Sequence, residues 1–287
     1  MTSAATGLSW DLLGDLRQML AYQFMVNALI AGTAVAVMAA AIGWFMVLRR
    51  QAFAGHTLSV ISFPGATGTP LLGLSPVAGY FGVCAAGAVI LARGSRATAD
   101  DERHQSAQIG TLQAFALGCG FLFATLYRGE LANVGALLFG TFLGITNRQV
   151  LVLLAVALAS LSCLAVTGRR LLLCSLDPAV AGARGLSVDR LSLGFLLVLG
   201  LAVAATAQIT GALLVFALLV MPAATAQTLT RRPSASLALT VALALTVTWL
   251  GLAIAFFSPY PVGFWITSLA FALLVAARAG RRLAGVR

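Results

Sequence analysis

The chain contains no lysine, only two histidines and only eight acidic residues among 287. Without lysine no GxxxxGK[ST] phosphate-binding loop can be present, so the chain does not hydrolyse ATP by that route. Its four cysteines are far apart and show no CxxC spacing, which excludes that metal or redox motif. Charged residues make up 9% of the chain, against about 25% in a soluble domain. This composition excludes a soluble globular protein.

Apolar residues dominate instead: they form 60% of the chain, and the mean hydropathy is +0.99. A helix needs about 20 apolar residues to cross a bilayer, and only helix bundles or closed barrels satisfy the backbone there. The continuous apolar run 150–166 lacks the alternation of a barrel strand. We therefore predict an all-α polytopic membrane protein with eight to nine transmembrane helices. The predicted spans are 22–48, 53–72, 75–91, 109–127, 150–167, 191–208, 211–228, 237–257 and 262–277.

The arginines predict the orientation of these spans. Fifteen of the eighteen fall on one side of the arrangement, and only Arg17, Arg128 and Arg148 fall on the other. Because basic residues accumulate in cytoplasmic loops, we expect the N-terminus outside and the C-terminus in the cytoplasm. Segment 128–147 is predicted to be an outer loop with a short re-entrant piece.

Three regions divide the chain. Residues 1–21 are predicted to form an interfacial N-terminal segment, because apolar and charged residues alternate there at helical spacing. Residues 22–280 are predicted to form a single transmembrane domain, and residues 281–287 a basic cytoplasmic tail. Because the arginines sit at the ends of apolar runs, they indicate membrane orientation and not binding of nucleic acid.

His56 is the one histidine or charged residue within a predicted span. Ionisable groups inside a membrane are costly and are functional candidates by default. Neutral imidazole is a common ligand of zinc and similar metals, although a histidine near the interface can also simply bond to the backbone. One histidine cannot form a metal site alone, but a symmetric dimer would bring two together. The other histidine, His104, lies in the polar segment 93–105, which is typical of a solvated loop and could bind a metal only weakly.

A polar connector at 173–190 joins two predicted spans on the cytoplasmic side. Asp177 and Pro178 are placed as the N-cap and first residue of a short helix, and Gly182 and Gly185 are placed to end it. This pattern fits a capped surface helix that only joins two spans. It also fits, less commonly, a coupling helix that docks on a nucleotide-binding subunit, and capping chemistry leaves both interpretations open.

Two apolar segments combine proline with small residues. Segment 53–72 contains Pro64 and Gly65 and is predicted to be bent or closely packed. Segment 211–228 begins at Gly211 and carries Pro222 at its centre. Proline removes a backbone hydrogen bond, so we expect a kinked, packed helix there.

Four segments, in order, resemble the permease subunits of the zinc/manganese-type ABC importers. The resemblance runs over residues 24–277. It is carried by VLRR (47–50) with FAGHTLSVISFPG (53–65), by LLFGTFLGIT (137–146), by DPAVAGARG (177–185) and by TGALLVFALLVMPAATA (210–226).

The resemblance implies the partners and the substrate. It implies a homodimer or pair of permease chains bound to two ABC ATPase subunits, which hold the ATP, in a bacterial cytoplasmic membrane. An extracytoplasmic metal-binding protein would deliver a divalent metal ion, zinc or manganese, and this chain would bind no cofactor of its own. The family's ATPase-contacting segment then corresponds to Asp177, Pro178, Ala181, Gly182 and Gly185.

One pair of positions departs from the family pattern. Family members usually carry aspartate, and histidine four residues later, in the second span, where both are thought to line the ion path. This chain has His56 and Val60 there. Loss of the carboxylate removes a hard oxygen ligand, and nitrogen ligation favours zinc over manganese; a different ion or a metal chelate also stays open.

Two other transporter classes compete with this interpretation. A permease of the siderophore or cobalamin importers would usually be longer by one span. A secondary transporter would show inverted repeats or broken helices in matching halves, and it would need no ATPase.

Overall fold

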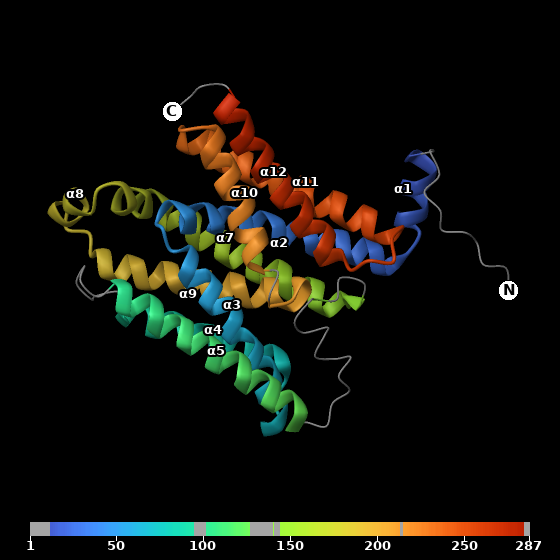
Figure 1. Ribbon diagram of the computed structural model, residues 1–287, viewed down its shortest axis with the longest axis horizontal. Coiled ribbons are helices and arrows are strands. Elements are labelled where there is room, and N and C mark those ends of the chain that lie inside the picture. The colour runs from blue at the N-terminus through green and yellow to red at the C-terminus, as the bar shows by residue number, and fades with distance from the viewer. Residues whose placement is uncertain (1–11, 95–101, 127–139, 141–143, 213–214, 284–287) are drawn as a thin grey trace.

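A computed structural model of the chain describes residues 12–94, 102–126, 140, 144–212 and 215–283, and their regular structure is entirely helical (Figure 1). The elements are α1 (Leu12–Leu20), α2 (Gln23–Leu48), α3 (Ala52–Gly68), the 3₁₀ turn η1 (Thr69–Leu72), α4 (Pro76–Gly94), α5 (Glu102–Leu126), α7 (Asn147–Leu176), α8 (Pro178–Ala183), α9 (Val188–Thr210), α10 (Val215–Leu229), α11 (Pro233–Phe256) and α12 (Val262–Leu283).

Seven of the described helices are long and apolar enough to cross a membrane: α2, α4, α5, α7, α9, α11 and α12. Helix α10 is also apolar but has only 15 residues, and α3 has 17. An all-helical polytopic membrane protein is therefore confirmed. The larger number of spans predicted from the sequence includes these two shorter helices.

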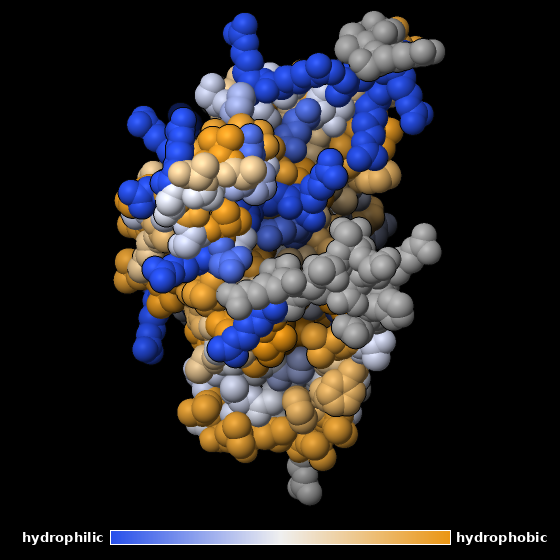
Figure 2. Space-filling view, turned by 90° about the vertical axis from the view of Figure 1, so that its left-hand side faces the viewer, coloured by the Kyte–Doolittle hydropathy of each residue, from blue (hydrophilic) through white to orange (hydrophobic). Residues whose placement is uncertain are grey.

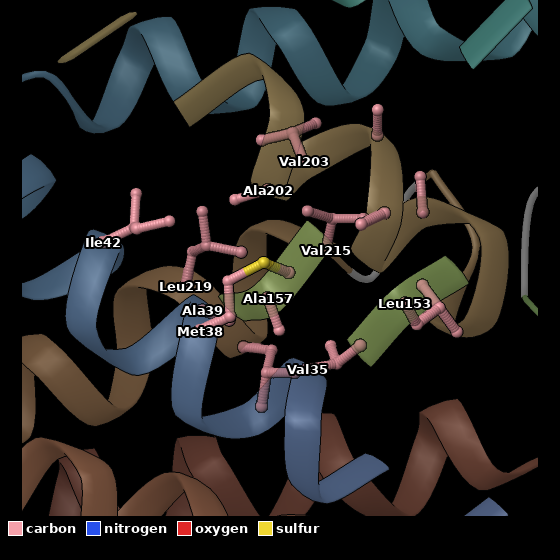
Figure 3. Packing of buried hydrophobic residues seen from close by; sticks show 14 of the residues in the cluster. Val35, Met38, Ala39, Ile42, Leu153, Ala157, Ala202, Val203, Val215 and Leu219 are labelled. Atoms are coloured by element: carbon pink, nitrogen blue, oxygen red, sulfur yellow. The ribbon is translucent and has the colours of Figure 1, made fainter. Parts of the chain in front are cut away.

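Helix α2 lies at the centre of the molecule, against α7, α9, α10 and α11. A helix that is apolar on all sides is buried on all sides, and α2 is buried along most of its length. Figure 3 shows Val35 and Met38 of α2 directed toward Ala157 of α7 and Leu219 of α10. The close approach of α10 depends on Gly43, because an added Cβ there would overlap the Leu219 carbonyl. Small residues thus let the central backbones meet.

Helix α3 packs against α4, α5 and α9. Gly65 and Gly79 lie where α3 crosses α4, and a Cβ on either would overlap the carbonyl oxygen of the other. Pro64 lies inside α3, where it removes one backbone hydrogen bond. The proline and glycine of segment 53–72 therefore lie at a close helix crossing.

Hydrogen bonds join different helices at both ends of the bundle. At one end, Trp44 Nε1 donates to Ser236 Oγ at 2.9 Å, and Arg281 Nη1 donates to the Thr228 carbonyl at 2.8 Å. At the other, Asn27 Nδ2 donates to Asn147 Oδ1 at 2.7 Å. Figure 1 shows α8 at the left, the C-terminal end of α12 at the top and left of centre, and α1 at the right.

Some predicted boundaries are wrong. Helix α7 continues past the predicted end at 167 and includes Arg169 and Arg170. Helix α5 begins at Glu102, inside the predicted polar loop 93–105. Arginine has high helix propensity, and its long side chain reaches water from a helix, so a helix can continue beyond the arginines at the end of its predicted membrane span. Most of the predicted outer loop 128–147 lies outside the described residues.

Candidate functional site

His56 lies in the second turn of α3, just after the corner that follows α2. Its half-buried imidazole meets the Phe216 ring of α10 edge to face, with 5.0 Å between ring centroids. The Nδ1 atom is buried and has no hydrogen-bond partner among the described residues. Leaving such a group unpaired costs about 1–3 kcal/mol. His56 thus offers a nitrogen that the described part of the fold does not use.

The hydroxyl groups near His56 bind helices together. Ser59 Oγ donates to the carbonyl of Ala212, at the end of α9. Thr57 Oγ1 donates to the Phe53 carbonyl at 2.9 Å and accepts from Gln113 Nε2 of α5 at 2.8 Å. These bonds fix the orientation of α3 between α5 and the α9 end. The hydroxyl protons are already committed, so the imidazole is the uncommitted polar group of this turn.

Val60, one turn beyond His56, is buried, with 7% of its surface exposed. It occupies the position at which the resemblance leads one to expect a second ligand, and an isopropyl group cannot bind a metal. No group of three or more His, Cys, Asp and Glu side chains is placed to hold a metal ion within the described ranges. Within the described ranges, this turn therefore offers one nitrogen as a potential ligand.

The connector between α7 and α9 forms the short helix α8. Asp177 caps it by accepting a hydrogen bond from the Val180 N–H at 3.0 Å, and Pro178 is the first helical residue. Gly185 has φ 75°, and the following N–H of Leu186 bonds back to the Ala181 carbonyl at 3.1 Å. The predicted N-cap and glycine terminator are confirmed. Gly182 lies inside the last turn of α8 instead of beyond it.

Helix α8 projects from one end of the molecule (Figure 1). Asp177, Pro178, Gly182 and Gly185 are exposed there, whereas Ala181 is fully buried. In Figure 2, which faces this end, hydrophilic residues gather over the upper part of the view. Exposed arginines belong to the elements that meet at this end: Arg50, Arg169, Arg170, Arg184, Arg190, Arg231, Arg232 and Arg282. The α8 end is therefore both basic and accessible to a partner.

The remaining predicted residues lie at breaks in the helices. Gly211 ends α9 with φ 79° and ψ 153°, a backbone region open essentially to glycine alone. Pro222 is buried inside α10. Gly211 is thus at the end of α9, and Pro222 is within α10. Ala212, which follows Gly211, accepts the hydrogen bond from Ser59 of α3 through its carbonyl.

Comparison with known proteins decides the family. The family model described as "ABC 3 transport family" matches residues 21–280. The chain belongs to this family. It is a membrane permease subunit of an ABC metal-import system and is not itself an ATPase. The family resemblance inferred from the four sequence segments is confirmed.

Two curated relatives of this ABC 3 permease illustrate the range of named metals. The "Manganese transport system membrane protein MntC" of Halalkalibacterium halodurans is 30% identical over 215 residues, covering 75% of this chain and 73% of the relative. The "Probable iron transport system membrane protein" of Haemophilus influenzae is 30% identical over 264 residues, covering 91% and 94%.

The structure of PsaBC from Streptococcus pneumoniae in complex with Fab has the same fold. Its matched chain superposes with a TM-score of 0.83 at 24% identity, covering 93% of this permease and 95% of that chain.

Three residues of the site were not singled out from the sequence. Phe216 and Gln113 are far from His56 in the chain, and nothing in the pattern of either span indicates that they meet α3. Arg49 belongs to the VLRR segment, whose sequence indicates a basic span end and the family resemblance but no contact with α7 or α9. Gln113 is a polar residue inside an apolar run, and such residues bond to other helices. Its position is the one feature of the sequence that indicates a contact with another helix.

Proposed function

We propose that this ABC 3 permease carries a divalent transition metal, zinc in preference to manganese, into a bacterial cell by alternating access. Two copies of the chain form the pathway, and two ATPase subunits bind the α8 ends and supply the energy. An extracytoplasmic metal-binding protein delivers the ion. The cargo is the substrate, and the chain needs no resident cofactor.

The observation that carries this proposal is the unpaired Nδ1 of His56 in the family's ion-path segment. Neutral imidazole binds zinc more readily than it binds manganese, which prefers carboxylate oxygen. A two-fold symmetric pair of permeases would place a second His56 on the same pathway. Two nitrogens and water molecules would then coordinate the ion in transit.

The arrangement of the ends supports the proposed orientation. The exposed arginines of the α8 end would lie in the cytoplasm, where Asp177, Pro178, Gly182 and Gly185 would meet the ATPase and buried Ala181 would anchor α8. With α3 and α10 included, the chain makes nine crossings, with its N-terminus outside. Helix α1 would then lie at the outer interface, since it is amphipathic.

Uptake of radioactive zinc and manganese by cells that express the transporter tests the assignment. His56→Ala should lower zinc uptake with unchanged amounts of permease in the membrane. His104→Ala is the matched control, because it removes the only other histidine and lies outside the predicted spans. Normal uptake of every metal tested by the His56→Ala variant would remove His56 from the ion path.

A further inference from the structure

The corner between α2 and α3 holds an arginine that reaches across the bundle. Helix α2 ends at Leu48, and α3 begins at Ala52. The corner is fixed by its backbone, since Gln51 N–H bonds to the Met46 carbonyl at 2.9 Å and Arg50 adopts φ 55°. Movement of this corner therefore moves the start of α3, and His56 is the fifth residue of that helix.

The Arg49 guanidinium contacts both stems of the α8 connector. Its Nη1 donates to Ser175 Oγ at 3.3 Å, and its Nη2 donates to Ser192 Oγ. Ser175 lies in the last turn of α7, and Ser192 lies in the second turn of α9. The same guanidinium lies over the Phe195 ring of α9, 5.4 Å from its centroid. One side chain thus joins the α2–α3 corner to the helix before α8 and to the helix after it.

The hydroxyl partners of Arg49 suit a contact that breaks and re-forms as the helices move. Hydroxyls bind a guanidinium less strongly than a carboxylate does, because they carry no opposite charge. Burial lowers the pKa of the Arg49 side chain, but guanidinium pKa values are high enough that the charge remains. The adjacent Arg50 is exposed and carries the same charge. Replacing Arg50 therefore removes one positive charge from the corner and leaves the contacts of Arg49 in place.

We propose that Arg49 is a positioning residue that transmits movement of the α8 connector to α3 and hence to His56. The proposal rests on the proposed function of α8 and His56. When the ATPases move α8, the stems of α7 and α9 move with it, and Arg49 carries the α2–α3 corner along. Without this link, ATP hydrolysis would proceed but would reorient the ion path poorly.

The test uses the assembled permease–ATPase complex in proteoliposomes and measures ATP hydrolysed and zinc taken up in the same sample. Arg49→Gln should leave assembly and hydrolysis intact and lower zinc uptake per ATP about tenfold, the scale of one lost charge-assisted contact. Arg50→Gln is the matched control, with the same loss of charge, and should couple normally. Unchanged uptake per ATP in Arg49→Gln, or an equal fall in Arg50→Gln, would overturn the proposal.

A second variant leaves the arginine in place. Ser175→Ala with Ser192→Ala removes both hydroxyl acceptors and should reproduce the loss of coupling, and adding Arg49→Gln should cause little further loss. Additive losses would contradict a shared link. The wild-type complex is measured first: absence of ATP-driven zinc uptake there rejects the proposed function, whereas normal wild-type uptake with normal Arg49→Gln coupling rejects only the role of Arg49.

Discussion

At the scale of single residues, two positions of the proposed ion path differ from the family's usual ligands. His56 supplies one uncommitted nitrogen, and Val60 is buried and apolar. The sequence draws attention to His56, because an ionisable residue within an apolar span is conspicuous, and the family resemblance draws attention to Val60. It could not identify Phe216 or Gln113 as neighbours of this turn, since helical periodicity gives a residue's face but not the helix that covers that face.

Restoring the carboxylate should change the preferred metal. In His56→Asp a hard oxygen ligand replaces a nitrogen, so we expect the ratio of manganese to zinc uptake to rise. Competition between the two labelled ions in the same cells measures this ratio directly. His56→Asn is the control, because asparagine matches aspartate in size and also lacks the imidazole nitrogens, but carries no charge. A ratio that stays the same in His56→Asp would mean that residue 56 does not select the ion.

At the scale of helices, local chemistry was predictable and long-range contact was not. Asp177, Pro178 and Gly185 act within a few residues of one another, so the ends of α8 could be predicted from capping rules. The bond from Ser59 to the Ala212 carbonyl joins α3 to the end of α9, and no local rule indicates it. The extension of α7 through Arg169 and Arg170 was also missed, because composition does not separate the membrane-embedded part of a helix from its aqueous continuation.

Capping of α8 should govern coupling and not insertion. Asp177→Ala removes the acceptor for the Val180 N–H, at a cost of about 1 kcal/mol to the helix. We expect weaker co-purification of the ATPase or less uptake per ATP, with normal permease levels in the membrane. Asp177→Asn keeps a capping oxygen and should behave nearly as wild type. Loss of the permease from the membrane in Asp177→Ala would assign the connector a structural role only.

The crossing of α3 and α4 should tolerate no added carbon. Gly79→Ala would place a methyl group against the Gly65 carbonyl and Thr69 Oγ1, and overpacking of this kind costs about 1–3 kcal/mol. The melting temperature of the purified permease in detergent should therefore fall. Gly82→Ala lies on the same helix, where an added Cβ meets nothing within 4 Å, and should leave it unchanged. Equal melting temperatures for the two variants would contradict the close crossing.

At the scale of the whole molecule, one end is basic and accessible and carries α8. The proposed orientation places this end in the cytoplasm. A green fluorescent protein fused to the C-terminus should fluoresce, whereas alkaline phosphatase fused after Tyr260, between α11 and α12, should be active. The reverse pattern would invert the topology and place α8 out of reach of any ATPase.

We propose that this permease imports a transition metal only when a separate ATPase drives it. The most direct measurement is accumulation of radioactive zinc in proteoliposomes that contain the permease, its ATPase and its metal-binding protein. We expect ATP-dependent accumulation that disappears when the ATPase is omitted and falls in the His56→Ala variant. Accumulation by the permease alone along an ion gradient, or none for any metal in the complete system, would contradict it.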